Sequence, residues 1–282
     1  MKPKLTLVVA VYNAVKYLEF IFTALKRQTT QEFEMVVADD GSGPEIRRLV
    51  DREKERATFP VVHLWQEDSG FRKNAMLNKS IEAARTDYLV FIDGDCVPHR
   101  QFLEDHLEQR QSNTALCGRR VNIGRRIVGR LTVNDIETGR LERFNLRLLL
   151  DGLLAGSSNL EDGVRIGNDR IRRVLHRGRA RILGCNFSVE KKLLENINGF
   201  NEDYQAPGRG EDSDIAFRLE LSGARLYPIR YSAIVYHLYH PATKEGRENK
   251  EIYESVVSSR NPVCRNGLKK LDAAPVHLVQ TS

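Results

Sequence analysis

Short runs of consecutive apolar residues alternate, over about the first hundred positions, with stretches in which apolar residues recur three or four positions apart. The runs predict strands at 5–11, 33–38, 61–65 and 88–92, and the spaced stretches predict helices at about 14–28, 44–56, 73–84 and 99–110. Three strand–helix units followed by a fourth strand favour a parallel sheet with helices on both faces.

The pattern is less regular in the second part of the chain. It predicts a strand over about 114–121, a leucine-dense helical stretch over 131–154, a polar stretch broken by glycine over 165–181, a strand over 182–189, a helix over 190–197, an acid-rich helix from about 211 and a strand over 233–236. The sequence from about 242 onward is mixed and polar, and weaker structure is expected there.

Carboxylates directly follow two of the predicted strands. The fourth strand runs into Asp93-Gly94-Asp95, and the second runs into Asp39-Asp40-Gly41-Ser42. Open α/β sheets bind ligands at the carboxyl ends of their strands, where paired carboxylates can hold a hard cation with nucleotide phosphates. An acidic turn without a ligand matches a single D-x-D equally well, so the pair predicts a metal site only together with the rest of the chain.

Arginine is concentrated in one segment. The formal net charge is +6, but residues 119–181 contain fifteen arginines, no lysine and seven acids, which gives +8 and leaves −2 for the remainder. Guanidinium groups bind phosphate bidentately, so we expect a polyanion near this segment unless its arginines pair with acids elsewhere on the fold. A helical excursion, a loop and an amphipathic surface on an anionic membrane all fit the pattern.

Several classes of protein are disfavoured. The turn Val11-Tyr12-Asn13-Ala14 after the first strand has no glycine, which argues against an NAD or FAD site. The arginines lack interleaved aromatic residues, so nucleic acid is not an expected partner. No apolar run reaches the roughly 18 residues that span a bilayer, and the first residues lack the cleavage site of a signal peptide.

The cysteines indicate the compartment. They are widely spaced and form no C-x-x-C pair, so neither a zinc site nor a disulfide framework is expected. The four residues are Cys96, Cys117, Cys185 and Cys264. They suit a reducing cytoplasm, which is the expected location, with peripheral attachment to the inner face of the cell membrane as an addition.

Six short motifs follow one another between about residues 5 and 240. They are Val8-Val9-Ala10-Val11-Tyr12-Asn13, Val36-Val37-Ala38-Asp39-Asp40-Gly41-Ser42, Gly70-Phe71-Arg72-Lys73-Asn74-Ala75, Phe91-Ile92-Asp93-Gly94-Asp95, Asn198-Gly199-Phe200 and Gly210-Glu211-Asp212-Ser213-Asp214. In this order they resemble the inverting GT-A glycosyltransferases of family 2, and the second half also resembles lactose-synthase-type galactosyltransferases and chondroitin-polymerase domains. The resemblance implies an α/β GT-A fold: a Rossmann-like, mostly parallel central sheet flanked by helices, with a helical arginine-rich excursion.

The resemblance assigns residues to a nucleotide-sugar donor. It implies that Asp40 accepts a hydrogen bond from a uracil ring, that Tyr12 stacks nearby and that Asp93 meets the ribose. The basic pair Arg72-Lys73 at a helix start can meet phosphate, helped by the free backbone amides there; two solvated basic residues are the simpler alternative.

A divalent metal, Mn²⁺ or Mg²⁺, is implied at the end of the fourth strand. Asp95 would ligate the ion that bridges the diphosphate of a UDP-sugar. A histidine beyond the acidic helix completes the metal shell in this type of enzyme. His237 is the better match, His240 is the second candidate, and an ordinary structural histidine is the alternative for both.

The acids that open the late helix supply the expected catalytic groups. Glycosyl transfer needs a base for the acceptor hydroxyl and a charge sink for the departing diphosphate. Asp212 resembles the base, Glu211 fits an acceptor-binding or supporting role, and Asp214 is expected to orient the loop. Because a carboxylate has a low pKa in water, this base requires a dry, aligned site.

The expected function is metal-dependent, inverting transfer of a hexose or hexose derivative from a UDP-sugar to a saccharide or lipid-linked glycan acceptor, in bacterial surface polysaccharide or lipopolysaccharide synthesis. A sugar nucleotidyltransferase and a non-catalytic nucleotide-sugar-binding protein are the alternatives. The expected organisation is a nucleotide-sugar-binding half over 1–118, the arginine-rich insert over 119–181, an acceptor-binding and catalytic half of the same domain over 182–241, and a tail over 242–282.

Overall fold

The computed structural model describes residues 2–143, 151–153, 156–175, 180–208, 210–241 and 248–271. The strands are β1 (Leu5–Val11), β2 (Phe33–Asp39), β3 (Val61–Trp65), β4 (Tyr88–Asp93), β5 (Cys96–Pro98), β6 (Thr114–Cys117), β7 (Arg120–Ile123), β8 (Phe187–Glu190), β9 (Arg225–Pro228) and β10 (Val235–Leu238). The α-helices are α1 (Val15–Leu25), α2 (Pro44–Arg56), α3 (Lys73–Ala83), α4 (Phe102–Gln109), α5 (Arg125–Val128), α6 (Val133–Glu137), α8 (Asp169–Leu175), α9 (Lys191–Asn196), α10 (Glu211–Leu221) and α11 (Glu248–Ser259), and two 3₁₀ turns are η1 (Arg140–Glu142) and η2 (Leu160–Gly163).

A seven-stranded sheet in the order β3-β2-β1-β4-β8-β6-β9 forms the centre of the molecule. β1 is parallel to β2 and to β4, and β3 is parallel to β2. Only β8 runs against its neighbours β4 and β6, and β9 is again parallel to β6. The expected α/β fold with a mostly parallel sheet is therefore confirmed.

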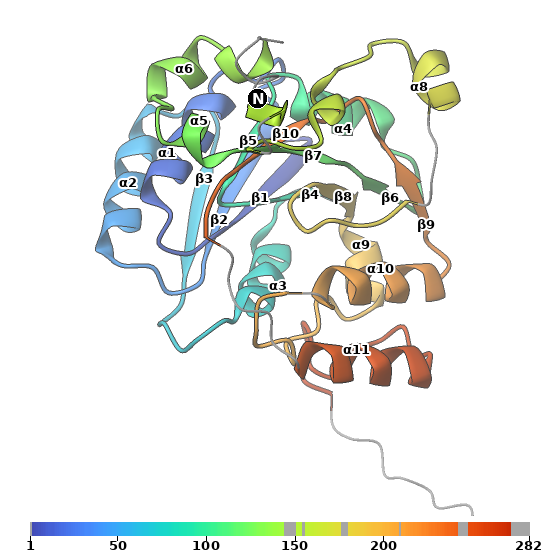
Figure 1. The fold of residues 1–282 in the computed structure, drawn as a ribbon. Coiled ribbons are helices and arrows are strands. Elements are labelled where there is room, and N and C mark those ends of the chain that lie inside the picture. Colours follow the sequence, from blue (N-terminus) through green and yellow to red (C-terminus); the bar gives the residue numbers. More distant parts are fainter. Residues whose placement is uncertain are drawn as a thin grey trace, which may run out of the picture.

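Helices cover both faces of this sheet, as Figure 1 shows. Apolar residues of α1, α2 and α4 form one buried cluster with the strands, and those of α3, α9 and α10 form another on the opposite face. β1, β2 and β4 are buried almost throughout, which explains why they appear in the sequence as continuous apolar runs instead of alternating ones.

A second sheet, β5-β10-β7, lies beside the first. The prediction of one strand over 114–121 was wrong, because the chain turns at Gly118 between β6 and β7. A Cβ at Gly118 would lie 2.2 Å from the side chain of Asn186. The backbone carbonyl of Asn186 accepts a 2.9 Å hydrogen bond from the N–H of Gly118. The predicted strand over 182–189 is likewise shorter, since the buried Asn186 Nδ2 donates to the carbonyls of Arg119 and Ala233 and β8 starts only after it.

The arginine-rich segment forms short elements within the described residues. The expected helix over 131–154 is not continuous: α6 ends before Gly139, which has a φ of 69°, and η1 follows. Residues 144–150 and 154 of that prediction lie outside the described part. Arg165 pairs with the buried Asp105 on α4 at 2.6 Å, so one of the fifteen arginines serves to anchor the segment.

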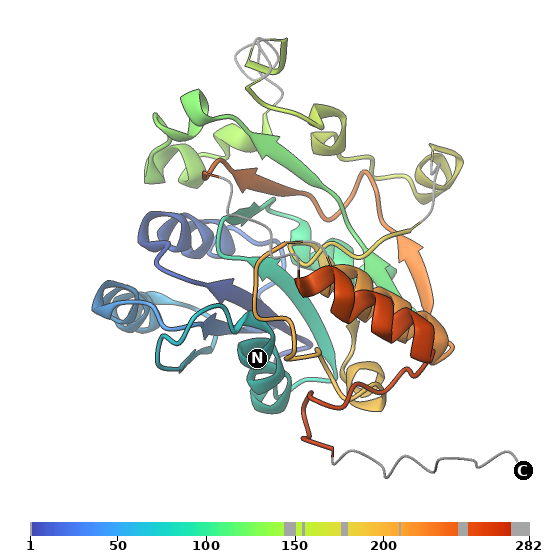
Figure 2. The same ribbon diagram turned by 60° about the horizontal axis from the view of Figure 1, so that its bottom comes forward.

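The C-terminal part has more structure than expected. The prediction of weak structure from about 242 was wrong for residues 248–271, which form α11 and an extended segment. Figure 2 shows α11 lying along α10, and the rings of Tyr253 and Phe217 meet edge to face between the two helices at 6.4 Å.

Candidate active site

Three parallel strands end at one edge of the main sheet and carry the predicted acids there. The register places Ala10 beside Asp93 and Val11 beside Asp39. Between Asp93 and Asp95 only glycine fits, because a Cβ at Gly94 would lie 2.8 Å from the carbonyl oxygen of Ala10. The glycine thus lets the chain turn tightly against β1 and places two carboxylates at the same strand end.

Asp95 meets both histidines that the sequence analysis proposed. Its Oδ2 is 3.1 Å from Nε2 of His240 and 3.5 Å from Nε2 of His237. The antiparallel pairing of β10 with β5 sets His237 opposite Cys96, next to Asp95. One candidate ligand atom from each residue lies within 4.8 Å of the other two.

The electrostatics of this triad fit a cation site. Burial disfavours the charge of Asp95, but the two histidines lower the pKa of its carboxyl. The contact with Asp95 raises the pKa of His240 to about 9, while burial lowers the pKa of His237. One carboxylate and two imidazoles suit a transition-metal ion such as Mn²⁺ better than Mg²⁺, which prefers oxygen ligands.

Lys73, the first residue of α3, joins the end of β4 to α10. Its ammonium lies 2.8 Å from Asp93 Oδ1 and 3.3 Å from Glu211 Oε1. Burial disfavours this charge, yet Asp93, Glu211 and Asp212 together raise the pKa of Lys73 well above its usual value. Burial raises the pKa of Glu211, whose Oε2 is buried without a hydrogen-bond partner among the described residues.

Asp212 is held in place by a backbone amide. Its Oδ2 accepts a 2.8 Å hydrogen bond from the N–H of Gly184, and a Cβ at Gly184 would lie 2.6 Å from its Oδ1. Burial raises the pKa of Asp212, and Lys73 opposes that rise. A carboxylate with a raised pKa is a stronger proton acceptor than one in water. The sequence did not reveal the role of Gly184, because the pattern placed this residue inside a predicted strand over 182–189.

The residues expected to hold a nucleobase lie beside the end of β2. Tyr12 is 55% exposed, and its hydroxyl donates to Asp68 at 3.0 Å. Asp40 is buried and accepts from Gln66 at 2.5 Å and from the backbone N–H of Arg72 at 2.7 Å. Burial raises the pKa of Asp40. Its contact with uracil stays a prediction; in the structure this carboxylate also fixes the start of α3.

The two residues of the basic pair at the start of α3 have different partners. The Arg72 guanidinium donates to the carbonyl of Glu67, whereas the ammonium of Lys73 lies in the acid cluster described above. Their predicted contact with phosphate remains untested.

Two further charged residues are placed differently from what their sequence context suggested. Asp214 is fully buried and pairs with Arg218 at 2.6 Å, which makes it a structural residue of α10. Arg120 was grouped with the arginine-rich segment, but it opens β7 beside β10 and lies 3.7 Å from Cys185 Sγ. Burial disfavours its charge, while Cys185, Cys96 and Asp93 raise the pKa of its guanidinium, so this arginine faces the site.

Comparison with known proteins agrees with this geometry. A family model described as Glycosyl transferase family 2 matches residues 6–159, more than half of the chain. The chain belongs to glycosyl transferase family 2. A second family model, described as N-terminal domain of galactosyltransferase, matches residues 174–241 of this family 2 chain. The resemblance drawn from the six motifs is confirmed, and membership argues against a nucleotidyltransferase.

Relatives cover the chain but are much longer. The chain is 25% identical to chondroitin synthase of Escherichia coli over 98% of its own length and 41% of the relative's. It is 24% identical to chondroitin synthase of Pasteurella multocida (strain Pm70), again over 98% of its own length but 29% of the relative's. This family 2 chain therefore spans less than half of either synthase.

Solved structures show the same fold. The mannosyltransferase PcManGT from Pyrobaculum calidifontis, in complex with GDP-Man and Mn²⁺, superposes with a TM-score of 0.55 at 18% identity over 93% of this chain and 63% of that one. Residues 1–349 of S. aureus TarS, in complex with UDP, give 0.59 at 18% identity over 91% of this chain and 65% of that one. Both support the GT-A fold.

Proposed function

We propose that this family 2 chain transfers a hexose or hexose derivative from a UDP-sugar to a saccharide acceptor, with inversion, in bacterial surface polysaccharide or lipopolysaccharide synthesis. The observation that carries the proposal is that the Asp95–His237–His240 triad and the Lys73-linked acids lie at one sheet edge. A UDP donor and a divalent ion agree with the UDP complex of TarS and the GDP-Man and Mn²⁺ complex of the mannosyltransferase. The chondroitin synthases support a polysaccharide product.

Each group has an assigned task in this proposal. Asp40 and Tyr12 hold the uracil, Asp93 meets the ribose, and the start of α3 with Arg72 receives the diphosphate. Asp95, His237 and His240 hold Mn²⁺, which would neutralise charge on the departing diphosphate.

The acceptor side depends on the two acids at the start of α10. Asp212 takes the proton of the acceptor hydroxyl, and the hydrogen bond from the Gly184 amide holds its carboxylate in a fixed orientation. Glu211 supports it, with its Oε2 available to an acceptor hydroxyl. Lys73 sets the separation between these acids and Asp93. Because these acids are only partly exposed, with side-chain exposures of 28% for Asp93 and 12% for Glu211, the reacting groups are partly shielded from water, which strengthens the interactions among them.

The decisive experiment is a screen of UDP-sugars for transfer and hydrolysis with Mn²⁺ or Mg²⁺ present, followed by analysis of the product anomer. Turnover of one UDP-sugar that requires Mn²⁺ and yields the inverted anomer is the expected outcome. Turnover of GDP-sugars alone, or full activity in chelator, would contradict the assignment.

We also propose a cytoplasmic location with attachment of the arginine-rich segment to an anionic membrane surface. Within the described residues no helix is both long and apolar enough to cross a bilayer. Exposed apolar side chains occur in the segment nonetheless: Leu153 is 82% exposed, and on α8 Val174 is 77% and Ile171 50% exposed, next to the exposed Arg170. Apolar side chains mixed with arginine suit the interface of an anionic leaflet.

A further inference from the structure

Residues 264–271, here called the C-terminal strap, are bound to the loop 197–202, and the buried Asn198 lies at the centre of this contact. Asn198 Nδ2 donates to the carbonyls of Cys264 and Lys269, each at 2.8 Å, and its Oδ1 accepts from the N–H of Lys269 at 2.8 Å. Asn198 has a φ of 62° and is 6% exposed. Both N–H donors and one of the two acceptor positions of its amide are thus used to shape the strap.

Backbone hydrogen bonds reinforce the same contact. The N–H of Cys264 donates to the carbonyl of Ile197 at 3.3 Å, that of Leu268 to Asn198 at 2.9 Å, and that of Glu202 to Asn266 at 2.7 Å. The loop has no regular secondary structure between α9 and α10, so the strap supplies partners that a sheet or helix would otherwise provide. Without the strap, several buried polar groups of the loop would lose their partners, which would destabilise the ordered loop.

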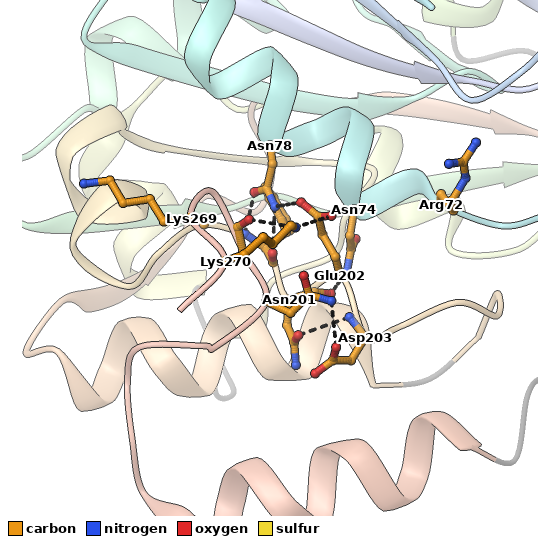
Figure 3. A network of polar contacts seen from close by, with 12 residues as sticks. Arg72, Asn74, Asn78, Asn201, Glu202, Asp203, Lys269 and Lys270 are labelled. Atoms are coloured by element: carbon orange, nitrogen blue, oxygen red, sulfur yellow. Dashed lines mark hydrogen bonds and ion pairs between the residues drawn. The ribbon is translucent and has the colours of Figure 1, made fainter. Parts of the chain in front are cut away.

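The loop is bound in turn to α3, as Figure 3 shows. Asn78 accepts from the N–H of Phe200 at 2.8 Å and donates to the Phe200 carbonyl at 2.9 Å and to Glu202 at 2.8 Å. Glu202 also pairs with Lys270 of the strap at 2.6 Å. One turn earlier, Asn74 donates to the carbonyl of Asn201 at 2.7 Å. α3 is therefore held by the loop on the turn that follows Lys73.

The same loop is bound to α10 from its other side. Arg218 is fully buried and donates to the carbonyls of Ile197 and Gly199, both at 2.9 Å, while it pairs with Asp214. Asp214 lies in the first turn of α10, the same turn as Glu211 and Asp212. The loop 197–202 thus lies between the two helices whose first residues form the Lys73–Glu211 ion pair.

We propose that the C-terminal strap is a positioning element, which locks the loop 197–202 and thereby sets the distance between Lys73 on α3 and Glu211 on α10. The proposal rests on the proposed function for its effect on turnover, but not for the structural coupling itself. The strap lies beyond residue 241, where the second of the two family matches ends, so neither match assigns it a role. None of its residues touches the candidate site directly; it acts through Asn198, Asn78 and Arg218.

Gly267→Ala tests this coupling in the full chain. A Cβ at Gly267 would lie 1.8 Å from the carbonyl oxygen of Asn198 and 2.7 Å from Cys264 Sγ. The strap therefore cannot pack against the loop 197–202 in this variant. Gly167→Ala is the matched control, because the nearest atom to its Cβ is Arg165 Nη1 at 3.9 Å. Hydrogen exchange measured on the protein alone should quicken at least tenfold in 73–76 and 211–215 as well as in 264–271, and the control should leave all three unchanged.

Kinetics supply the second readout, at a temperature where circular dichroism shows both variants folded. Gly267→Ala should lower kcat at least tenfold, while the KM for the nucleotide-sugar and the affinity for UDP stay within about threefold. A structural defect alone would lower the fraction of active molecules. It would leave both the kcat per folded molecule and the KM unchanged. If Gly267→Ala does not fold, Lys270→Ala removes the pair with Glu202 and a 3.1 Å hydrogen bond to the carbonyl of Gly267, and a two- to threefold rise in exchange around 74–78 is expected.

Faster exchange confined to 264–271 and 197–202, with 73–76 and 211–215 unaffected, would overturn the proposal. So would unchanged exchange at 74–78 in Lys270→Ala when Gly267→Ala fails to fold. If the unmodified protein turns over no UDP-sugar, the proposed function fails, but the exchange experiment still decides on the strap.

Discussion

The arginine-rich segment 119–181 and the C-terminal stretch 248–271 both lie outside the main sheet, but they are attached to it in different ways. The first is attached by the pairing of β7 with β10, by apolar packing against α1 and β5 and by ion pairs such as Arg165 with Asp105, and it presents exposed apolar side chains. The second is fixed by backbone groups and by the buried amide of Asn198. Unusual composition therefore marked the region that presents exposed apolar side chains, whereas the region that binds the loop 197–202 had an ordinary composition.

The largest expected effect tests whether the acids at the start of α10, which the C-terminal stretch braces, perform the chemistry. Asp212→Asn keeps the shape of the side chain and removes its basicity, so turnover should fall by about 10²–10⁴ with UDP affinity nearly unchanged. Ser213→Ala, an exposed neighbour on the same turn, is the control. Near-normal turnover of Asp212→Asn would transfer the role of base to Glu211.

The next effect concerns the metal triad, whose His237 on β10 pairs with Asn122 on β7 of the arginine-rich segment. Calorimetry should show UDP binding at least tenfold tighter with Mn²⁺ than with chelator, and Asp95→Ala should abolish that difference, because the carboxylate is the only anionic member of the triad. Asp87→Ala, at an exposed position before β4, should leave the difference intact. Equal affinity with and without Mn²⁺ in the unmodified protein would refute the triad's role.

A smaller effect is expected at the membrane. The protein should sediment with anionic but not neutral vesicles at low salt and should be released at high salt, since each basic residue near an anionic leaflet contributes about 1 kcal/mol. Arg170→Ser combined with Val174→Ser should weaken binding about tenfold, whereas Arg47→Ser on α2 should not.

The choice of substitutions in the vesicle experiment follows from the structure. Arg172 is buried and donates to the carbonyl of Ile166 at 2.7 Å, so replacing it would disturb the segment itself. Arg177 and Arg179 lie outside the described residues. Absence of any preference for anionic lipid would remove the membrane proposal and leave the acceptor as the partner to test.

The smallest effect is one of pH on the helix that anchors the arginine-rich segment. Burial lowers the pKa of His106 on α4 to about 4, so this histidine is neutral in the folded protein. In the unfolded chain this histidine binds a proton at about pH 6.5. Its contribution to the free energy of unfolding is therefore fully present above that pH and declines as the pH falls toward 4. Unfolding should become easier by roughly 1 kcal/mol between pH 7.5 and 5.5. Urea titrations of His106→Gln should lose this contribution; an unchanged slope would contradict it.

The sequence sufficed for the parts of the molecule that depend on local patterns. Buried parallel strands are continuous apolar runs, so β1 to β4 and the acids after them could be predicted. Because β10 pairs with β5, His237 and His240 both lie close to Asp95. Which histidine lies closer to Asp95 depends on the long-range pairing of His237 with Cys96, and no local pattern encodes that pairing. The break at Gly118 and the role of Gly184 depend on contacts with Asn186 and Asp212, and the strap depends on Asn198; these are long-range polar contacts with no periodic signal.

The antiparallel strand β8 has a consequence for synthesis of the chain. β1 to β4 can assemble early, but the free edge of β4 is paired only when Phe187 stacks on Phe91, with ring centroids 4.6 Å apart. Until the ribosome has released about residue 190, the nascent sheet presents an apolar strand with unsatisfied backbone groups, which is a template for aggregation. Late pairings of this kind also slow folding, because the entropy of closing a long loop must be overcome first. Expression at low temperature, where synthesis and collapse are both slower, is therefore expected to raise the soluble yield more than changes at the surface would.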